Sequence, residues 1–172
     1  MNGLNFEMNG LPYLDIPVTS LTNSSYINGQ HRSTVYCFTA LNKFCHLRYL
    51  NLSGNVIGQL VIFMMLKNIP NGTHLTHLLL NSCNIGPGKH YISEISQLGC
   101  IQKLEHLELA NNKLESLDHF MNLFRKCCST LHFLNLEMNS LKQDSLPLVQ
   151  NLLKNPFQLN QLYVGKNQLG NH

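Results

Sequence analysis

Apolar residues recur along the chain with a fixed internal spacing. In each unit, apolar residues stand at relative positions 1, 4, 6 and 11, and an asparagine or a cysteine stands at position 9. One such unit consists of Leu47, Leu50, Leu52, Asn55 and Ile57. The five clear copies begin at Leu47, Leu75, Leu104, Leu131 and Leu159. Successive copies are 28, 29, 27 and 28 residues apart, so one structural unit is used repeatedly along the chain.

A sixth, weaker copy lies upstream. It consists of Leu11, Leu14, Ile16, Thr19 and Leu21. Thr19 stands where asparagine or cysteine is expected, and the step from Leu11 to Leu47 is 36 residues. About eight extra residues therefore interrupt this copy. We place them in the polar, turn-rich stretch Asn23–Arg32, which we expect to be a surface excursion.

Each unit predicts a strand followed by a helix. The leucines at positions 4 and 6 alternate with polar or aromatic residues, which is typical of a short strand with one buried face. The expected strands centre on 13–17, 49–53, 77–81, 106–110, 133–137 and 161–165. Apolar residues at helical spacing predict helices within 59–67, 91–98, 117–126 and 146–153. Asp144 and Ser145 are expected to cap the last helix, and Pro147 suits its first turn.

Position 9 has a structural role. An asparagine directed inward can bond backbone groups of the turn that would otherwise be buried and unpaired. We therefore expect Asn112 and Asn139 to be buried and bonded to the backbone. Cys83 fills the same slot as a small apolar residue with a weak donor, which favours an inert buried thiol over a reactive one.

The pattern L-x-x-L-x-L-x-x-N/C-x-L resembles leucine-rich repeats, and the period is similar to that of the ribonuclease-inhibitor-like class. That class includes ribonuclease inhibitor, the sensing domains of NOD-like immune receptors, Ran GTPase-activating protein and PRAME-type adaptors. The resemblance runs from Leu11 to Leu169. It implies an α/β leucine-rich-repeat solenoid, with a curved parallel sheet on the concave face and helices on the convex face. Residues 1–172 are then a single domain of about six repeats, beginning at Leu11, Leu47, Leu75, Leu104, Leu131 and Leu159. Because the last repeat has a strand but no helix, we expect a segment of a longer array.

The resemblance implies a non-enzymatic module of an intracellular sensor or adaptor, which binds a protein partner on its concave face. One fold hosts many functions, so a regulator of an enzyme, either an inhibitor or a GTPase-activating protein, remains the alternative. For the latter, Arg48 is the one arginine beside the concave face. The chain lacks the motifs of hydrolases, zinc peptidases and phosphate-binding loops, and Gly86–Lys89 is expected to be a turn.

Composition limits the classes of partner that we expect for this chain. The net charge is +3 and no run of lysine and arginine occurs, which disfavours nucleic acid. The apolar run Leu60–Leu66 is too short to span a membrane, and the first residues lack the features of a secretory signal. The six cysteines show no metal-ligand spacing, which favours reduced thiols in a cytoplasmic protein, without metal or cofactor. In that setting the glycosylation sequons at Asn23, Asn51 and Asn71 carry little weight.

The expected concave face carries a column of rings at position 3. The candidate protein-binding residues at positions 3 and 5 are Tyr49, Asn51, His77, Leu79, His106, Glu108, Phe133, Asn135 and Tyr163. Exposed rings in a row can bury a large apolar area against a partner. The competing interpretation is that aromatic residues suit strands and stack on one another. For the neighbours His77 and His106, a metal site is disfavoured, and either a mild pH response or an ordinary surface pair remains open.

Overall fold

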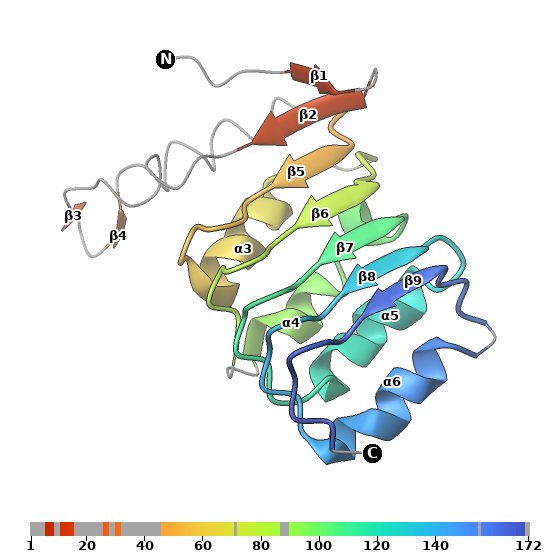
Figure 1. Ribbon diagram of the computed structural model, residues 1–172. Helices are drawn as coiled ribbons and strands as arrows, with labels where there is room; N and C mark the ends of the chain where they lie inside the picture. The colour runs from red at the N-terminus through yellow and green to blue at the C-terminus, as the bar shows by residue number, and fades with distance from the viewer. Residues whose placement is uncertain are drawn as a thin grey trace.

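A seven-stranded sheet runs through the computed structural model, which describes residues 6–8, 11–15, 26–27, 30–31, 46–70, 72–86, 90–154 and 156–170. Its strand order is β1-β2-β5-β6-β7-β8-β9, so the strands follow one another in chain order (Figure 1). Their bounds are β1 Phe6–Met8, β2 Leu11–Asp15, β5 Tyr49–Asn51, β6 His77–Leu79, β7 His106–Glu108, β8 Phe133–Asn135 and β9 Gln161–Tyr163. From β2 onward every pairing is parallel and in the register set by the repeat.

The sheet departs from the expected one at its first strand. β1 pairs with β2 antiparallel, with Phe6 opposite Tyr13, so the expectation of a wholly parallel sheet is wrong there. Only two residues separate β1 from β2, and a parallel pairing needs a crossover of a dozen or more. Within the expected excursion, β3 (Tyr26–Ile27) and β4 (Gln30–His31) form a second antiparallel pair. The rest of the excursion lies outside the described residues.

The strands are shorter than the alternation predicts. β5 ends at Asn51, two residues before the expected end, and the later strands end in the same way. Beyond the strand the backbone still bonds to the next repeat, with Leu52 N–H donating to the Leu79 carbonyl at 2.9 Å. The alternation thus continues past the residues that have regular strand geometry. β2 spans Leu11–Asp15 and so begins two residues before the expected 13–17.

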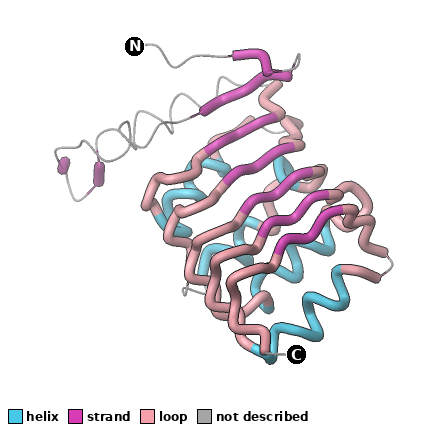
Figure 2. The backbone as a smooth tube through the Cα atoms, viewed as in Figure 1, coloured by secondary structure: helices cyan, strands magenta, loops and turns pink. Residues whose placement is uncertain are grey.

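The described helices lie on one side of the sheet, as Figure 2 shows. Their bounds are α3 Gly58–Lys67, α4 His90–Ile95, α5 Met121–Lys126 and α6 Leu146–Leu152, with short 3-10 turns at Gly99–Ile101, Asp118–Phe120 and Gln143–Ser145. The expected cap of the last helix is wrong. Ser145 makes no capping hydrogen bond, because a 3-10 turn leads into α6 and satisfies its first amides through backbone carbonyls. Pro147 does lie in the first turn, as expected.

The core lies between the sheet and these helices. The leucine at the centre of each strand from β5 to β8 is buried, as the alternation predicts; these are Leu50, Leu78, Leu107 and Leu134. From the other side, α3 contributes Ile62, Met65 and Leu66, while Phe120 and Phe124 stack at 5.9 Å between ring centroids. The result is an α/β repeat fold with a parallel sheet and helices on one of its faces.

The buried asparagines Asn112 and Asn139 link the repeats that begin at Leu75, Leu104 and Leu131, and the predictions for both residues are confirmed. The Asn112 side-chain oxygen accepts from the Cys83 and Ile85 amides at 2.9 and 3.3 Å. Its side-chain nitrogen donates to the Leu80 carbonyl at 2.7 Å and to that of Ala110 at 3.1 Å. One side chain thereby satisfies backbone groups of two repeats.

Cys83 has the surroundings expected of an unreactive thiol. It is fully buried, and its thiol donates to the Leu52 carbonyl at 3.1 Å. Burial raises the pKa of the Cys83 thiol to about 12, so little thiolate forms at neutral pH. The described cysteines, Cys83, Cys100, Cys127 and Cys128, form no disulfide. Cys37 and Cys45 lie outside the described residues.

Position 8 of each repeat takes a left-handed backbone conformation. The five residues there are Gly54, Ser82, Asn111, Met138 and Lys166, with φ between 54° and 78°. Asparagine and glycine tolerate this conformation, whereas a side chain such as methionine is strained in it. Met138 has φ 55° and is 49% exposed, so no burial of its side chain offsets the strain.

Replacing Asn112 by leucine should lower the free energy of unfolding by about 1–3 kcal/mol, because the turn amides of Cys83 and Ile85 lose their acceptor. Urea unfolding would measure the change. Asn122→Leu, at an exposed site on α5, is the matched control and should change stability little. An Asn112→Leu variant as stable as the parent would show that the asparagine does not hold the repeats together.

Replacing Met138 by asparagine should raise the free energy of unfolding by about 1 kcal/mol, because asparagine adopts a positive φ at lower cost. Asn111 holds the equivalent place one repeat earlier. Met138→Ala is the control, since it shortens the side chain but keeps the Cβ that causes the strain. Equal thermal midpoints for the asparagine and alanine variants would contradict the strain argument.

Candidate functional site

The side of the sheet away from the helices carries the predicted binding residues. In β5, β6, β7 and β8 the middle residue is buried and the flanking residues are half-buried, so positions 3 and 5 point away from the core. In β9 the flanking residues are exposed, and Tyr163 is 43% exposed. We call this side of the sheet the ladder face. No described helix covers it (Figure 1).

The rings on the ladder face stack on one another. Ring centroids are 5.4 Å apart for Tyr49 and His77, 5.2 Å for His77 and His106, and 3.9 Å for His106 and Phe133. Phe133 also meets Tyr163 at 5.3 Å with the rings tilted by 39°. We call these five residues the ring ladder. Parallel strands lie about 4.8 Å apart, which places rings at equivalent positions at stacking distance.

Stacking changes what the rings offer to a partner. Each inner ring has a neighbouring ring on both sides, so its edge, rather than its face, is available. The column of rings has two interpretations, a surface that binds a partner or aromatic residues that suit strands and stack on one another. The rings of Tyr49, His77, His106 and Phe133 do stack and are half-buried, and partner binding stays a prediction.

His106 and Glu108 form the fixed polar centre of the face. The His106 Nε2 atom lies 2.8 Å from the Glu108 Oε1 atom. Asn81 donates to the other carboxylate oxygen, and its own side-chain oxygen accepts from the Ala110 amide at 2.8 Å. The hydrogen bond from His106 holds the pKa of Glu108 below its usual value, against the opposing effect of burial. Glu108 therefore stays ionised at neutral pH.

His77 lies between two rings, and its pKa depends on burial and on the charges nearby. Burial lowers its pKa, the neighbouring His106 lowers it further, and Glu105 opposes both effects. Its Nδ1 atom lies 3.0 Å from the Thr76 hydroxyl oxygen. His77 is thus held as a neutral ring at neutral pH.

Three other predicted residues are used differently. Asn51 and Asn135 bond locally, their side-chain oxygens accepting from the Ser53 and Glu137 amides at 2.9 and 3.0 Å. These two side chains brace the turn after the strand. Leu79 is half-buried in the middle of the face, where the sequence analysis placed it.

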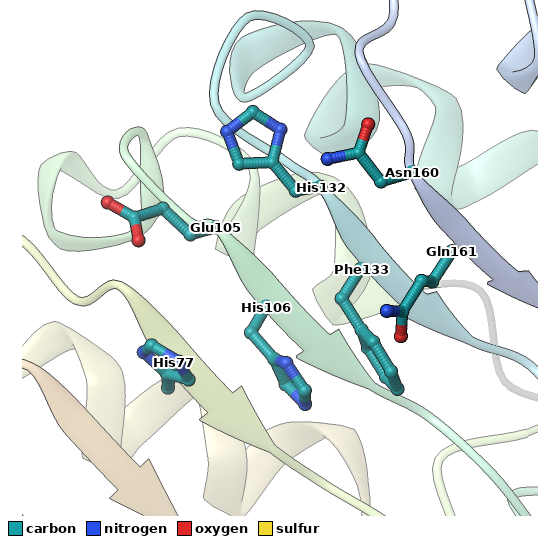
Figure 3. Close-up of a pocket in the computed structure, with 7 residues that line it drawn as sticks. All are labelled: His77, Glu105, His106, His132, Phe133, Asn160 and Gln161. Atoms are coloured by element: carbon teal, nitrogen blue, oxygen red, sulfur yellow. The ribbon is translucent and has the colours of Figure 1, made fainter.

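A hollow of about 420 Å³ opens beside the ring ladder (Figure 3). Its walls are His77, Glu105, His106, His132, Phe133, Asn160 and Gln161. Of these, Glu105, His132, Asn160 and Gln161 were not among the predicted binding residues. Glu105, His132 and Asn160 occupy position 2, one residue before the strand begins.

Backbone bonding brings position 2 to the ladder face. The Glu105 carbonyl accepts from two successive amides, those of His132 and Phe133, at 2.9 and 3.1 Å. The same double acceptance recurs at the Arg48, Thr76 and His132 carbonyls. Two successive amides that point to one carbonyl break the simple alternation of a strand, so positions 2 and 3 both line the hollow. Alternation alone assigns position 2 to the other face, but the recurrence of polar residues there was a usable signal.

No metal site or membrane span is found in the part of the chain that the structure describes. No three His, Cys, Asp or Glu side chains gather there as a metal would require. None of the described helices has the length and hydropathy needed to cross a bilayer.

The turn expected at Gly86–Lys89 lies mostly outside the described residues. Gly86 is described, but residues 87–89 are not.

Stability should fall as the pH is lowered from 7 toward 5. The pKa of His77 is lower in the folded chain than the unfolded value of about 6.5, so protons bind the unfolded state more readily. The contribution of His77 is therefore present above pH 6.5 and is lost as the pH falls below it. His77→Phe keeps a ring in the stack without a titrating group and should flatten this dependence in urea unfolding. Tyr49→Phe, which changes no imidazole, should keep the parent's dependence, and equal slopes for all three proteins would contradict the assignment.

Comparison with known families bears on two segments of this fold. Residues 45–59 and 73–88 match the family model described as Leucine Rich repeat. These segments contain the copies that begin at Leu47 and Leu75, which supply β5 and β6. No curated protein and no solved structure matches the chain. The chain therefore contains leucine-rich repeats at these two positions, within an α/β repeat fold.

Proposed function

We propose that this chain is a non-enzymatic protein-binding module whose partner lies on the ladder face. Leucine-rich repeats are in general protein-interaction modules, and two segments of the chain match that family. The ring ladder is the observation that carries the choice of face. It is a continuous aromatic surface on the side of the sheet that no described helix covers.

The ring ladder suits binding because it is already ordered. Rings held between neighbours have little side-chain freedom left to lose when a partner arrives, and preorganisation of this kind favours affinity. Aromatic residues are also enriched where interface energy is concentrated. The column is strengthened by Leu79, which adds apolar area beside the rings.

The wider architecture follows from the same repeat. We propose that residues 1–172 are one domain of six leucine-rich repeats, curved with the ladder face concave, of the ribonuclease-inhibitor-like class. The register supports this, because Tyr49, His77, His106 and Phe133 lie opposite one another across four successive strands. In this proposal the protein is a cytoplasmic sensor or adaptor that binds neither nucleic acid nor membrane.

The alternative of a GTPase-activating protein has Arg48 as its candidate arginine, and this residue already has a partner within the chain. The Arg48 guanidinium donates to the His74 carbonyl at 2.7 Å, so it ties one repeat to the next. An arginine that reaches into a partner's site needs its donors for the partner. An inhibitor that simply covers an enzyme remains compatible with the ladder face and is tested by the same experiment.

Removing apolar side chains from the ladder face should abolish partner capture without unfolding the protein. The test variant is Leu79→Ser with Tyr163→Ser. Tyr163 lies at the end of the ring ladder and meets the ring of Phe133, so its loss leaves the stack from Tyr49 to Phe133 in place. Capture of proteins from cell lysate, quantified by mass spectrometry, should fall about tenfold or more, while urea unfolding stays close to that of the parent.

The control removes two apolar side chains on the helix side. Leu60 and Leu153 are 48% and 63% exposed there, and the control variant is Leu60→Ser with Leu153→Ser. Capture by this control should equal that of the parent. If the control loses capture and the test variant keeps it, the binding surface is on the helices.

A further inference from the structure

The ladder face and the rest of the chain have opposite charge. The whole chain carries 12 lysines and arginines against 9 aspartates and glutamates. At positions 2, 3, 5 and 7 of the repeats from β5 to β9, the charged residues are Glu105, Glu108, Glu137 and Arg48. One positive and three negative groups give this face a net charge of −2, which leaves +5 for the remainder of the chain. An acidic face on a basic chain favours a basic partner through steering and complementarity.

Two of these carboxylates are available to a partner. Glu105 is exposed at the wall of the hollow, and Glu137 is half-buried at the other border of the face. Within the described residues neither forms an ion pair. Glu108, by contrast, is occupied by His106 and Asn81. The face thus offers two unpaired negative groups on either side of the ring ladder.

The neighbouring groups keep this negative charge in place. Burial and the proximity of His106 lower the pKa of His77, so its ring adds no positive charge at neutral pH. Arg48 lies at the far end of the face and is bonded to the His74 carbonyl. Lys103 and Lys166 belong to the flanking turns and lie at positions outside the face.

The hollow is an open depression large enough for a long side chain. Its volume of about 420 Å³ is within the usual range for binding pockets. Glu105 lines the hollow at its border, together with the rings of His106 and Phe133 and the side-chain amides of Asn160 and Gln161 (Figure 3). An arginine or lysine side chain combines an apolar stem with a cationic end, which suits a hollow lined by rings with a carboxylate at its border.

We propose that the ladder face binds a segment of a partner protein that combines cationic and apolar side chains, with an arginine or lysine in the hollow against Glu105. A second cationic side chain of the segment pairs with Glu137. Apolar side chains between the two pack on Leu79 and on the ring ladder. This proposal rests on the proposed function, because it names the chemistry of the partner for the same face.

Selection from a random 12-residue peptide library displayed on phage, with the full chain as target, tests the proposal. The selected peptides should be enriched in arginine and lysine together with apolar residues. Their affinity for Glu105→Gln with Glu137→Gln should be about tenfold weaker than for the parent, and the difference should shrink at high salt. Glu94→Gln, at an exposed site on α4, is the matched control and should bind like the parent.

The outcomes distinguish this proposal from the proposed function on which it rests. Two outcomes would overturn the proposal that the partner is basic but keep the ladder face as the binding surface. In the first, the selected peptides need Leu79 and Tyr163 but are neutral or acidic. In the second, they bind the Glu105→Gln with Glu137→Gln variant as well as the parent. Peptides that bind the Leu79→Ser with Tyr163→Ser variant as well as the parent would overturn both. A library that yields no peptide specific for the parent would also count against the proposal.

Discussion

The buried asparagine at position 9 is the interaction on which the stacking of this molecule depends. The Asn139 side-chain oxygen accepts from the Asn112 and Leu114 amides of the preceding repeat, as Asn112 does for Cys83 and Ile85. Each turn is buried by its neighbours and would otherwise leave its amides without partners, at a cost comparable to a lost hydrogen bond for each. From Cys83 onward, these turns take their side-chain acceptor from the asparagine of the next repeat. This dependence ties neighbouring repeats together in the register that the strands have.

Fixed register then determines the ladder face. Because equivalent residues lie opposite one another in adjacent strands, a ring at position 3 in successive repeats must stack on the ring before it. The same register places His106 beside His77 and Glu108 beside Asn81, and these neighbours add to the lowering of the pKa of His77 by burial and of the pKa of Glu108 by its hydrogen bond with His106. Within the residues that the structure describes, the surface that we propose for binding is thus a direct product of the repeat.

The electrostatic character of this surface has a separate origin. Lysines are placed mostly in the helices and turns, where their stems can lie along the surface and their charges remain in water. The strands and the residues that flank them instead carry rings, amides and glutamates on the ladder face. A chain with a positive net charge consequently presents an acidic ladder face. The net charge of the whole chain therefore has the opposite sign to the net charge of this face.

The sequence by itself determined the positions of the five repeats from Leu47, the burial of the central leucines, the role of Asn112 and the column of rings, because each depends only on spacing along the chain. Tertiary structure alone decided several features of the site. Glu105 and His132 join the hollow because one carbonyl accepts two successive amides, and Asn51 and Asn135 turn back to brace their own turns. Ser145 does not cap α6, because a 3-10 turn leads into that helix. Arg48 donates a hydrogen bond to a carbonyl 26 residues away. β1 pairs antiparallel because only two residues connect it to β2, and this connection lies outside the repeat pattern. These features depend on bonds between neighbouring repeats, and such bonds exist only once the repeats have stacked.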